Sequence, residues 1–293
     1  MTHTQDDFTN NKAGEGHTYS SAQQAGECHT HSSAQQATSQ QTAPQHTHAH
    51  LREHHGAGEE KPLLEFKDFC FAYESHAVLR HIDLHIHAGD SVVLMGDNGS
   101  GKSTLLKAIN GLIFPAQGTY EFDGNVVSEH SMKDVKFAKR LHQRIGYIFQ
   151  DSDAQLFCAS VEDEIAFGPL QMGLSQDEVS QRVSDVAKLI GIENLLTRAP
   201  YNLSGGEKKK VALACIVSMN PDVYCFDEPL NGLDQRTRTW LIDFLRQLKS
   251  AGKTLIIATH DQSLADELAS YFVFMGEWHG YVDKPHIHVN KRA

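Results

Sequence analysis

The chain has 293 residues and a formal net charge of −11, and 40% of its residues are hydrophobic. This length supplies one large or two ordinary domains with ample core, whereas the acidic balance argues against a nucleic-acid partner. Its five cysteines are scattered without a Cys-x-x-Cys pair, and no apolar run reaches the ~18 residues of a membrane span, which excludes a disulfide framework and a transmembrane helix.

The composition and charge also indicate the cellular compartment and the character of the protein surface. The longest cationic run is Lys208–Lys210, which we interpret as a solvated helix face. The N-terminal segment is too polar for a secretory signal. We therefore expect a reduced, cytosolic, soluble protein that acts at a membrane only through a partner.

Residues 1–60 differ in composition from the rest of the chain and are predicted to be a disordered, histidine-rich tail, because they hold too little apolar area to offset their ordering entropy. A twelve-residue unit at 14–25 recurs at 26–37, and the second copy gains two metal-binding side chains, Cys28 and His31. Nine of the 19 histidines lie in this tail. Two interpretations stay open: a solvated low-complexity tail, or a loose imidazole trap for Ni²⁺, Co²⁺ or Zn²⁺.

Residues 61–293 have the pattern of a folded domain. Strands are predicted at 64–73, 82–86, 92–95, 119–122, 145–149, 223–226 and 254–258, with a terminal hairpin at 271–275 and 280–282. Helices are predicted from Lys102, over most of 161–199, at 211–217, at 235–250 and briefly before the hairpin. Strands that alternate with helices predict an α/β sheet with a parallel core and ligands at the strand ends, and residues 161–199 form an all-helical insert.

One predicted strand carries three histidines. The alternation at 82–86 places His81, His85 and His87 on the face opposite the apolar residues. A solvated face is the favoured interpretation, although neighbours at i and i+2 can bind a metal weakly.

The most informative stretch joins the apolar strand at 92–95 to the helix that opens at Lys102. It has the spacing Gly-x-x-x-x-Gly-Lys-Ser, which in this context predicts a phosphate-binding loop. The glycines let backbone amides turn toward an anion, Lys102 reaches the β- and γ-phosphates, and Ser103 is a ligand for Mg²⁺. The expected nucleotide-binding residues of this loop are Gly96, Asp97, Asn98, Gly99, Ser100, Gly101, Lys102, Ser103 and Thr104.

Four polar residues follow other predicted strands. Asp227 is expected to complete the Mg²⁺ shell, and Glu228 to orient the attacking water or take its proton. Gln150 can hydrogen-bond that water or the metal, and His260 can reach the γ-phosphate. Each of these residues alone has an ordinary structural explanation, and their combination favours hydrolysis of a phosphoanhydride.

A second glycine string, Leu203–Glu207, opens another helix. Ser204 is a reasonable N-cap for that helix. The same hydroxyl, together with the amides of Gly205 and Gly206, is also suited to bind a phosphate.

Taken in order, and with Asn231–Asp234 added, these motifs resemble the Walker A, Q-loop, signature, Walker B, D-loop and switch-histidine motifs of ABC-transporter ATPase subunits, over about 63–276. The resemblance implies a P-loop NTPase of the ABC type, with a RecA-like parallel-sheet core, an antiparallel β subdomain and the α-helical insert. It implies ATP and Mg²⁺ as cofactors, Tyr73 stacked on adenine, and Asp234 of the D-loop beside the nucleotide. Leu230 and Glu207 depart mildly from the family pattern.

Finer detail is similar to the ATPases of energy-coupling factor importers. Residues 149–157 and 161–169 resemble the segment after the Q-loop in that group, and residues 207–214 resemble its cobalt and nickel members. The resemblance implies two chains that face head to tail. We expect a homodimer, bound peripherally to integral-membrane transport subunits at the cytoplasmic face of the membrane.

The leading hypothesis is an ATPase that energises nickel or cobalt import. The alternatives are the shared ATPase of a vitamin importer and a soluble ABC ATPase in metal-cofactor assembly. A metal-storage protein is disfavoured, because storage needs no hydrolytic residues.

Overall fold

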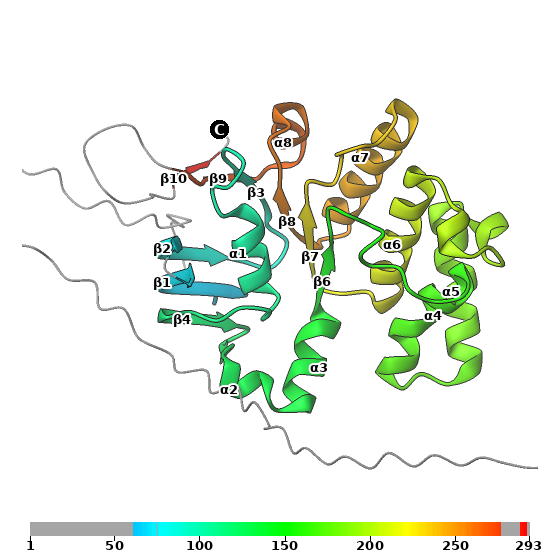
Figure 1. Cartoon of the computed structure of the whole chain (residues 1–293), viewed down its shortest axis with the longest axis horizontal. Coiled ribbons are helices and arrows are strands. Elements are labelled where there is room, and N and C mark those ends of the chain that lie inside the picture. Colours follow the sequence, from blue (N-terminus) through cyan, green and yellow to red (C-terminus); the bar gives the residue numbers. More distant parts are fainter. Residues whose placement is uncertain (1–60, 75, 277–287, 292–293) are drawn as a thin grey trace, which may run out of the picture. The chain divides into compact units, whose positions relative to one another are not determined.

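The computed structural model describes residues 61–74, 76–276 and 288–291, which form two sheets with helices (Figure 1). The predicted tail at 1–60 and the predicted strand at 280–282 lie outside the described residues. Among the described residues, every helix is too short or too polar to cross a membrane.

The first sheet is antiparallel and follows the strand order β2-β1-β4-β5. Its strands are β1 (Leu64–Tyr73), β2 (His76–Ile86), β4 (Gln117–Phe122) and β5 (Asn125–Val126). One face is apolar and buried, with Phe66 stacked on Tyr120 at a centroid distance of 4.3 Å. This sheet is the antiparallel subdomain that the family resemblance implies.

The second sheet has the order β10-β9-β3-β8-β7-β6 and is parallel except for β10. Its strands are β3 (Ser91–Met95), β6 (Ile145–Ile148), β7 (Val223–Asp227), β8 (Thr254–Ala258), β9 (Tyr271–Phe274) and β10 (His288–Lys291). Every residue of β3, β7 and β8 is buried, which is typical of parallel strands covered on both faces.

Alternate residues of the parallel strands enter two separate cores. In β7, Tyr224 and Phe226 pack with the helices of the insert, whereas Val223 and Cys225 pack with α1 and the antiparallel sheet. The two faces of the parallel sheet therefore carry different helices, and this separation determines which motifs can meet within one chain.

The helices are α1 (Lys102–Ile109), α2 (Glu129–Met132), α3 (Val135–Arg144), α4 (Val161–Met172), α5 (Gln176–Ile190), α6 (Gly205–Met219), α7 (Gln235–Ser250) and α8 (Gln262–Leu268). Short 3₁₀ turns lie at Glu193–Leu195 and Pro200–Asn202. Residues 161–199 thus hold α4 and α5 and no strand. The sequence predicts no element at α2 or α3, because α3 is mostly polar and buries only Leu141.

Candidate active site

The carboxyl ends of the parallel strands meet at one edge of the sheet. The phosphate loop follows β3, Asp227 ends β7, and His260 stands two residues beyond β8. Because these strands are neighbours in the order β3-β8-β7, residues far apart in sequence come together here.

The phosphate loop depends on glycine at two positions. Gly96 has φ 147°, and a Cβ there would lie 2.0 Å from the carbonyl oxygen of Met275. Gly101 has φ 98°, and its Cβ would lie 3.1 Å from Leu79 Cδ2 on β2. A side chain at either position would clash or strain the backbone, so the loop geometry follows directly from the motif. The exposed tip of the loop is Asp97, Asn98 and Gly99.

Lys102 opens α1 and lies beneath the loop. It is 5% exposed, and its Nζ donates to the carbonyl oxygens of Gly96 at 2.6 Å and Asp97 at 3.0 Å. The N-cap of α1, Gly101, offers no side-chain acceptor to the first-turn amides. The loop therefore presents a cation and a helix N-terminus, the combination that binds phosphate.

Ser103 and Asp227 form the expected pair of oxygen ligands. The Ser103 hydroxyl donates to Asp227 Oδ1 at 3.0 Å across 124 residues of sequence, and Asp227 is 5% exposed. The Tyr147 hydroxyl donates to the other carboxylate oxygen at 3.2 Å. Burial, together with the Asp227 charge, raises the pKa of Tyr147, so this hydroxyl remains a neutral donor that orients the carboxylate. Sequence reasoning missed Tyr147, whose only signal was its place on β6.

Glu228 and His260 form a second pair beside the first. Glu228 Oε2 lies 3.0 Å from His260 Nδ1 and accepts a hydrogen bond from the Thr259 hydroxyl at 3.4 Å. Glu228 Oε1 is buried and has no hydrogen-bond partner among the described residues. The Glu228 backbone has φ 45°, and its N–H donates to the Ala258 carbonyl oxygen at 2.9 Å. A non-glycine residue held in this conformation is common at active sites.

Gln150 is exposed and lies two residues beyond β6, and α6 holds its backbone. The Lys209 ammonium donates to the carbonyl oxygens of Phe149 at 2.9 Å and Gln150 at 3.2 Å. Lys209 is 3% exposed, and burial lowers its pKa to about 8. The interpretation of Lys208–Lys210 as a uniformly solvated face was therefore wrong for Lys209, because the middle lysine turns inward to satisfy two carbonyls.

Ser204 caps α6 in a reciprocal pair with Glu207. Its backbone N–H and its hydroxyl each donate to Glu207 Oε2 at 2.8 Å, and the first of these bonds is the main cause of a lowered Glu207 pKa. Asp234 caps α7 by accepting from the Thr237 N–H at 3.0 Å. A Cβ on Gly206 would lie 2.8 Å from the Thr237 hydroxyl. Gly206 therefore packs against the start of α7, whereas Ser204 and Gly205 are exposed.

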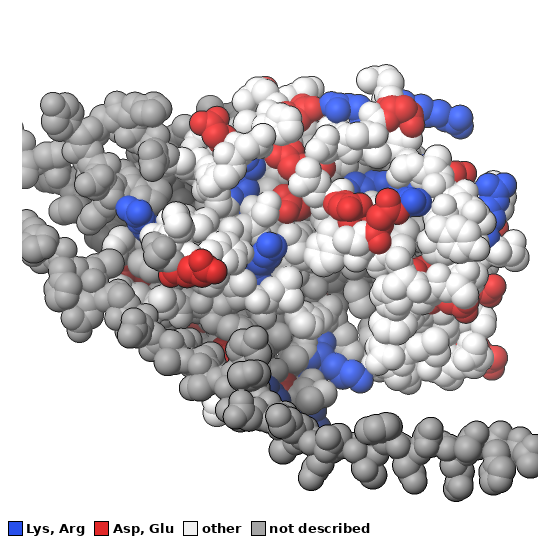
Figure 2. Space-filling model, in the orientation of Figure 1, with Lys and Arg blue, Asp and Glu red and all other residues white. Residues whose placement is uncertain are grey.

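The signature segment does not meet the phosphate loop of the same chain. Among the described residues, no hydrogen bond or ion pair joins 204–206 to 96–104. Helices α1 and α6 cover opposite faces of the parallel sheet, as Figure 1 shows. Tyr73 ends β1, is 43% exposed and packs edge-on against Phe71, so its ring is accessible to a ligand. The face in Figure 2 intersperses acidic with basic side chains.

These observations define the class of protein. A glycine loop between a buried strand and a helix, a lysine beneath it and a hydroxyl–carboxylate pair beside it form the site of a P-loop nucleotide hydrolase. The chemistry of these residues fits a nucleotide with Mg²⁺, since the cation takes hydroxyl and carboxylate oxygens. The buried Ser100 hydroxyl, without a partner among the described residues, adds a polar atom within the loop.

Comparison with known proteins identifies the family. The family model described as ABC transporter matches residues 79–231, and the chain belongs to this family. It is an ATPase of the kind that is coupled to transport, and it binds ATP.

Individual relatives are consistent with this assignment. The chain is 42% identical over 217 residues to the nickel import ATP-binding protein LarO of Lactiplantibacillus plantarum, covering 74% of this chain and 90% of that protein. It is 42% identical over 216 residues to the energy-coupling factor transporter ATP-binding protein EcfA2 of Methanospirillum hungatei, covering 73% of this chain and 53% of that protein.

A solved structure shares the fold. The cbiO1 protein of Clostridium perfringens, part of the ABC transporter complex cbiONQ, is 34% identical and superposes with a TM-score of 0.66. The match covers 74% of this chain and 85% of that one. The family and the fold class expected from the sequence are both confirmed.

Proposed function

We propose that this chain is the ATP-hydrolysing subunit that energises import of a transition-metal ion, nickel or cobalt, through membrane partner subunits. The observation that carries the hydrolytic part is the placement of two pairs, Ser103 with Asp227 and Glu228 with His260, beside one phosphate loop. The nickel-import relative and the histidine-rich residues 1–60 support the choice of cargo.

We assign the residues of the site the following roles. Lys102 neutralises the β- and γ-phosphates, and Ser103 and Asp227 hold Mg²⁺, which supplies positive charge at the transferred phosphoryl group when bound. Glu228 accepts a proton from the attacking water, and His260 orients the Glu228 carboxylate and reaches the γ-phosphate. Gln150 positions water or metal, and Tyr73 stacks on adenine.

Two chains are needed for one complete site. Ser204 and Gly206 of one chain close over the nucleotide held by Lys102 and Ser103 of the other, and Asp234 lies at the same junction. The support is the separation of α1 and α6 on opposite sheet faces, together with the exposure of Ser204. A symmetric homodimer then has two equivalent sites, and its closing and opening drive the membrane subunits.

A mixing experiment tests this arrangement. Lys102→Ala removes the cation of the loop, whereas Ser204→Asp keeps an N-cap residue and places a negative charge where the partner's nucleotide lies. Each variant alone should be inactive. A one-to-one mixture should recover about a quarter of the wild-type phosphate release, because half of the dimers then contain one intact site. Inactivity of the mixture, or full activity of Ser204→Asp alone, would overturn the two-chain site.

The cargo is tested separately. Membranes that contain the tagged chain should yield integral-membrane partners that bind nickel or cobalt, with the ATPase attached peripherally. Recovery of a vitamin-binding membrane protein would instead assign the vitamin-importer alternative. Recovery of the ATPase in the soluble fraction alone would assign a role in metal-cofactor assembly.

A further inference from the structure

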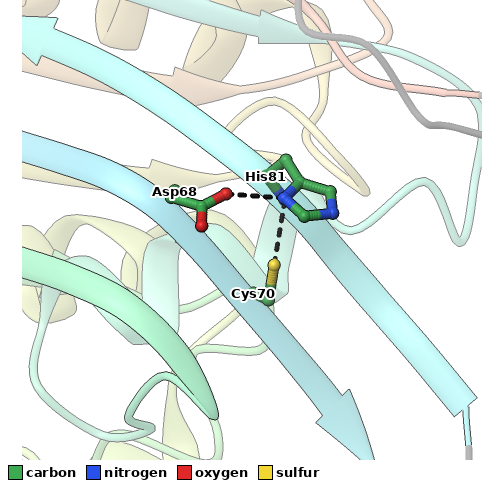
Figure 3. A group of neighbouring side chains, drawn as sticks. All are labelled: Asp68, Cys70 and His81. Atoms are coloured by element: carbon green, nitrogen blue, oxygen red, sulfur yellow. Dashed lines mark hydrogen bonds and ion pairs between the residues drawn. The ribbon is translucent and has the colours of Figure 1, made fainter. Parts of the chain in front are cut away.

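Three side chains of the antiparallel sheet, none of them assigned to the nucleotide site, converge at one place. Asp68 and Cys70 project from β1, and His81 projects from the neighbouring strand β2 (Figure 3). One carboxylate oxygen, the thiol sulfur and one ring nitrogen all lie within 4.8 Å of one another. A carboxylate oxygen is a hard ligand, an imidazole nitrogen an intermediate one and a thiolate sulfur a soft one, and all three occur in protein metal centres.

The backbone brings these side chains together through two opposed bulges. Between matched register pairs, β1 carries one extra residue at 67–68, and β2 carries one extra residue at 80–81. Asp68 and His81 both have φ 49°, the left-handed conformation that glycine usually supplies in such a bulge. The alternation of a regular strand predicts only a solvated histidine face, so the bulges create the cluster.

Neighbouring groups hold the cluster in place. His81 Nδ1 lies 2.5 Å from Asp68 Oδ1, and the His81 backbone N–H donates to Cys70 Sγ at 3.1 Å. The other Asp68 oxygen accepts from Gln117 Nε2 at 2.6 Å, while the Asp68 N–H donates to Asp83 Oδ1 at 2.9 Å. These supporting hydrogen bonds are of the kind that orients metal ligands.

We propose that Asp68, Cys70 and His81 form a binding site for a divalent transition metal such as Zn²⁺, Co²⁺ or Ni²⁺. A thiolate and a carboxylate supply two negative charges, which match the charge of the ion, and a thiolate disfavours Mg²⁺ and Ca²⁺. The side chains of His81 and Asp68 are 48% and 49% exposed, so water can reach the fourth position of a tetrahedral ion.

Binding requires a small rearrangement with balanced protons. The Cys70 thiol loses one proton to solvent, and the ring proton of a neutral His81 shifts from Nδ1 to Nε2 by exchange with water. Ligand atoms on one tetrahedral metal are about 3.3 Å apart, so the contact between His81 and Asp68 opens by less than an ångström. The ion then cross-links β1 and β2 just before Tyr73.

Cobalt gives a test that separates this site from the histidine tail. The full-length chain loaded with Co²⁺ should show a thiolate-to-cobalt charge-transfer band, to which histidine ligands contribute nothing. In a Cys28→Ser background, which removes the thiol of the tail, Cys70→Ser should abolish the band, whereas Cys158→Ser in the folded domain should leave it unchanged. Absence of the band from the Cys28→Ser chain, or its survival when Cys70→Ser is added to that chain, would overturn the proposal.

A second variant keeps the test decisive if Cys70→Ser does not fold. His81→Ala should weaken Co²⁺ binding measured by this band by roughly tenfold or more, while His85→Ala on the same strand serves as the matched control. Circular dichroism and ATP binding verify that each variant is folded. Equal cobalt affinity of His81→Ala and His85→Ala would mean that the cluster is only a hydrogen-bonded surface group.

Discussion

The Nδ1 atom of His260 lies 3.0 Å from Oε2 of Glu228, although β8 and an entire helix separate the two residues in sequence. The imidazole thereby fixes one carboxylate oxygen, while Oε1 is buried without a partner among the described residues. An oxygen of this kind is available to accept a proton from water.

Replacing Glu228 with Gln should abolish most turnover without preventing ATP binding. The amide keeps the shape of the side chain and loses its basicity, so phosphate release should fall ~10²–10⁴-fold, the usual contribution of general base catalysis. ATP affinity, measured by equilibrium dialysis, should change little. Glu193→Gln, on an exposed 3₁₀ turn, is the matched control, and undiminished hydrolysis by Glu228→Gln would refute the assigned role.

Lys102→Ala should bind ATP weakly. Hydrogen bonds to charged groups contribute roughly 1.5–3 kcal/mol, so we expect affinity to fall about 10- to 100-fold. Equilibrium dialysis with ATP measures the change directly. Lys107→Ala removes an exposed lysine from the same helix and should bind as wild type does. Equal affinities for the two variants would contradict the phosphate role of Lys102.

The pH dependence of stability should reveal the buried ammonium of Lys209. Its pKa in the folded state is about 8, below the ordinary value of 10.5, so between these values the unfolded chain binds more protons than the folded chain. Stability therefore rises with pH in this window and is lost as pH falls through 8.

Urea unfolding of wild type and Lys209→Met at pH 8 and pH 10 checks this prediction. The difference in unfolding free energy should move in favour of wild type by on the order of 2 kcal/mol as pH rises. Lys210→Met is the control for loss of a charge on the same helix. It removes an ammonium that lies 4.5 Å from the centre of the Trp240 ring. A difference that does not vary with pH would argue against a buried Lys209 ammonium.

Deleting residues 1–60 should leave ATP hydrolysis intact and lower the amount of nickel or cobalt bound per chain. All proposed catalytic residues lie beyond this segment, whereas nine histidines lie within it. Metal analysis after dialysis measures the loss. Unchanged metal content would reject the tail as a metal trap, and the metal that the truncated chain retains should depend on Cys70.

The phosphate loop was predictable from the sequence because its geometry is local. Gly96 and Gly101 adopt positive φ values that glycine tolerates and other residues rarely do, so a short string of residues specifies the backbone curl. The acidic residues at the end of β7, Asp227 and Glu228, were predictable for a related reason. The end of a buried apolar strand is visible in the sequence as the point where the apolar run stops. The family followed from the order of these strings.

Tertiary structure alone decided which side chains meet. The Ser103 hydroxyl donates to Asp227, and the Tyr147 hydroxyl donates to the same carboxylate. Lys209 turns inward and donates to the carbonyl oxygens of Phe149 and Gln150. The contacts of Tyr147 and Lys209 have no sequence signal, because strand order and helix rotation set them over long separations. The two β-bulges that join Asp68 to His81 are likewise invisible in the alternation of residues, since one extra residue in each strand reverses which face a side chain takes.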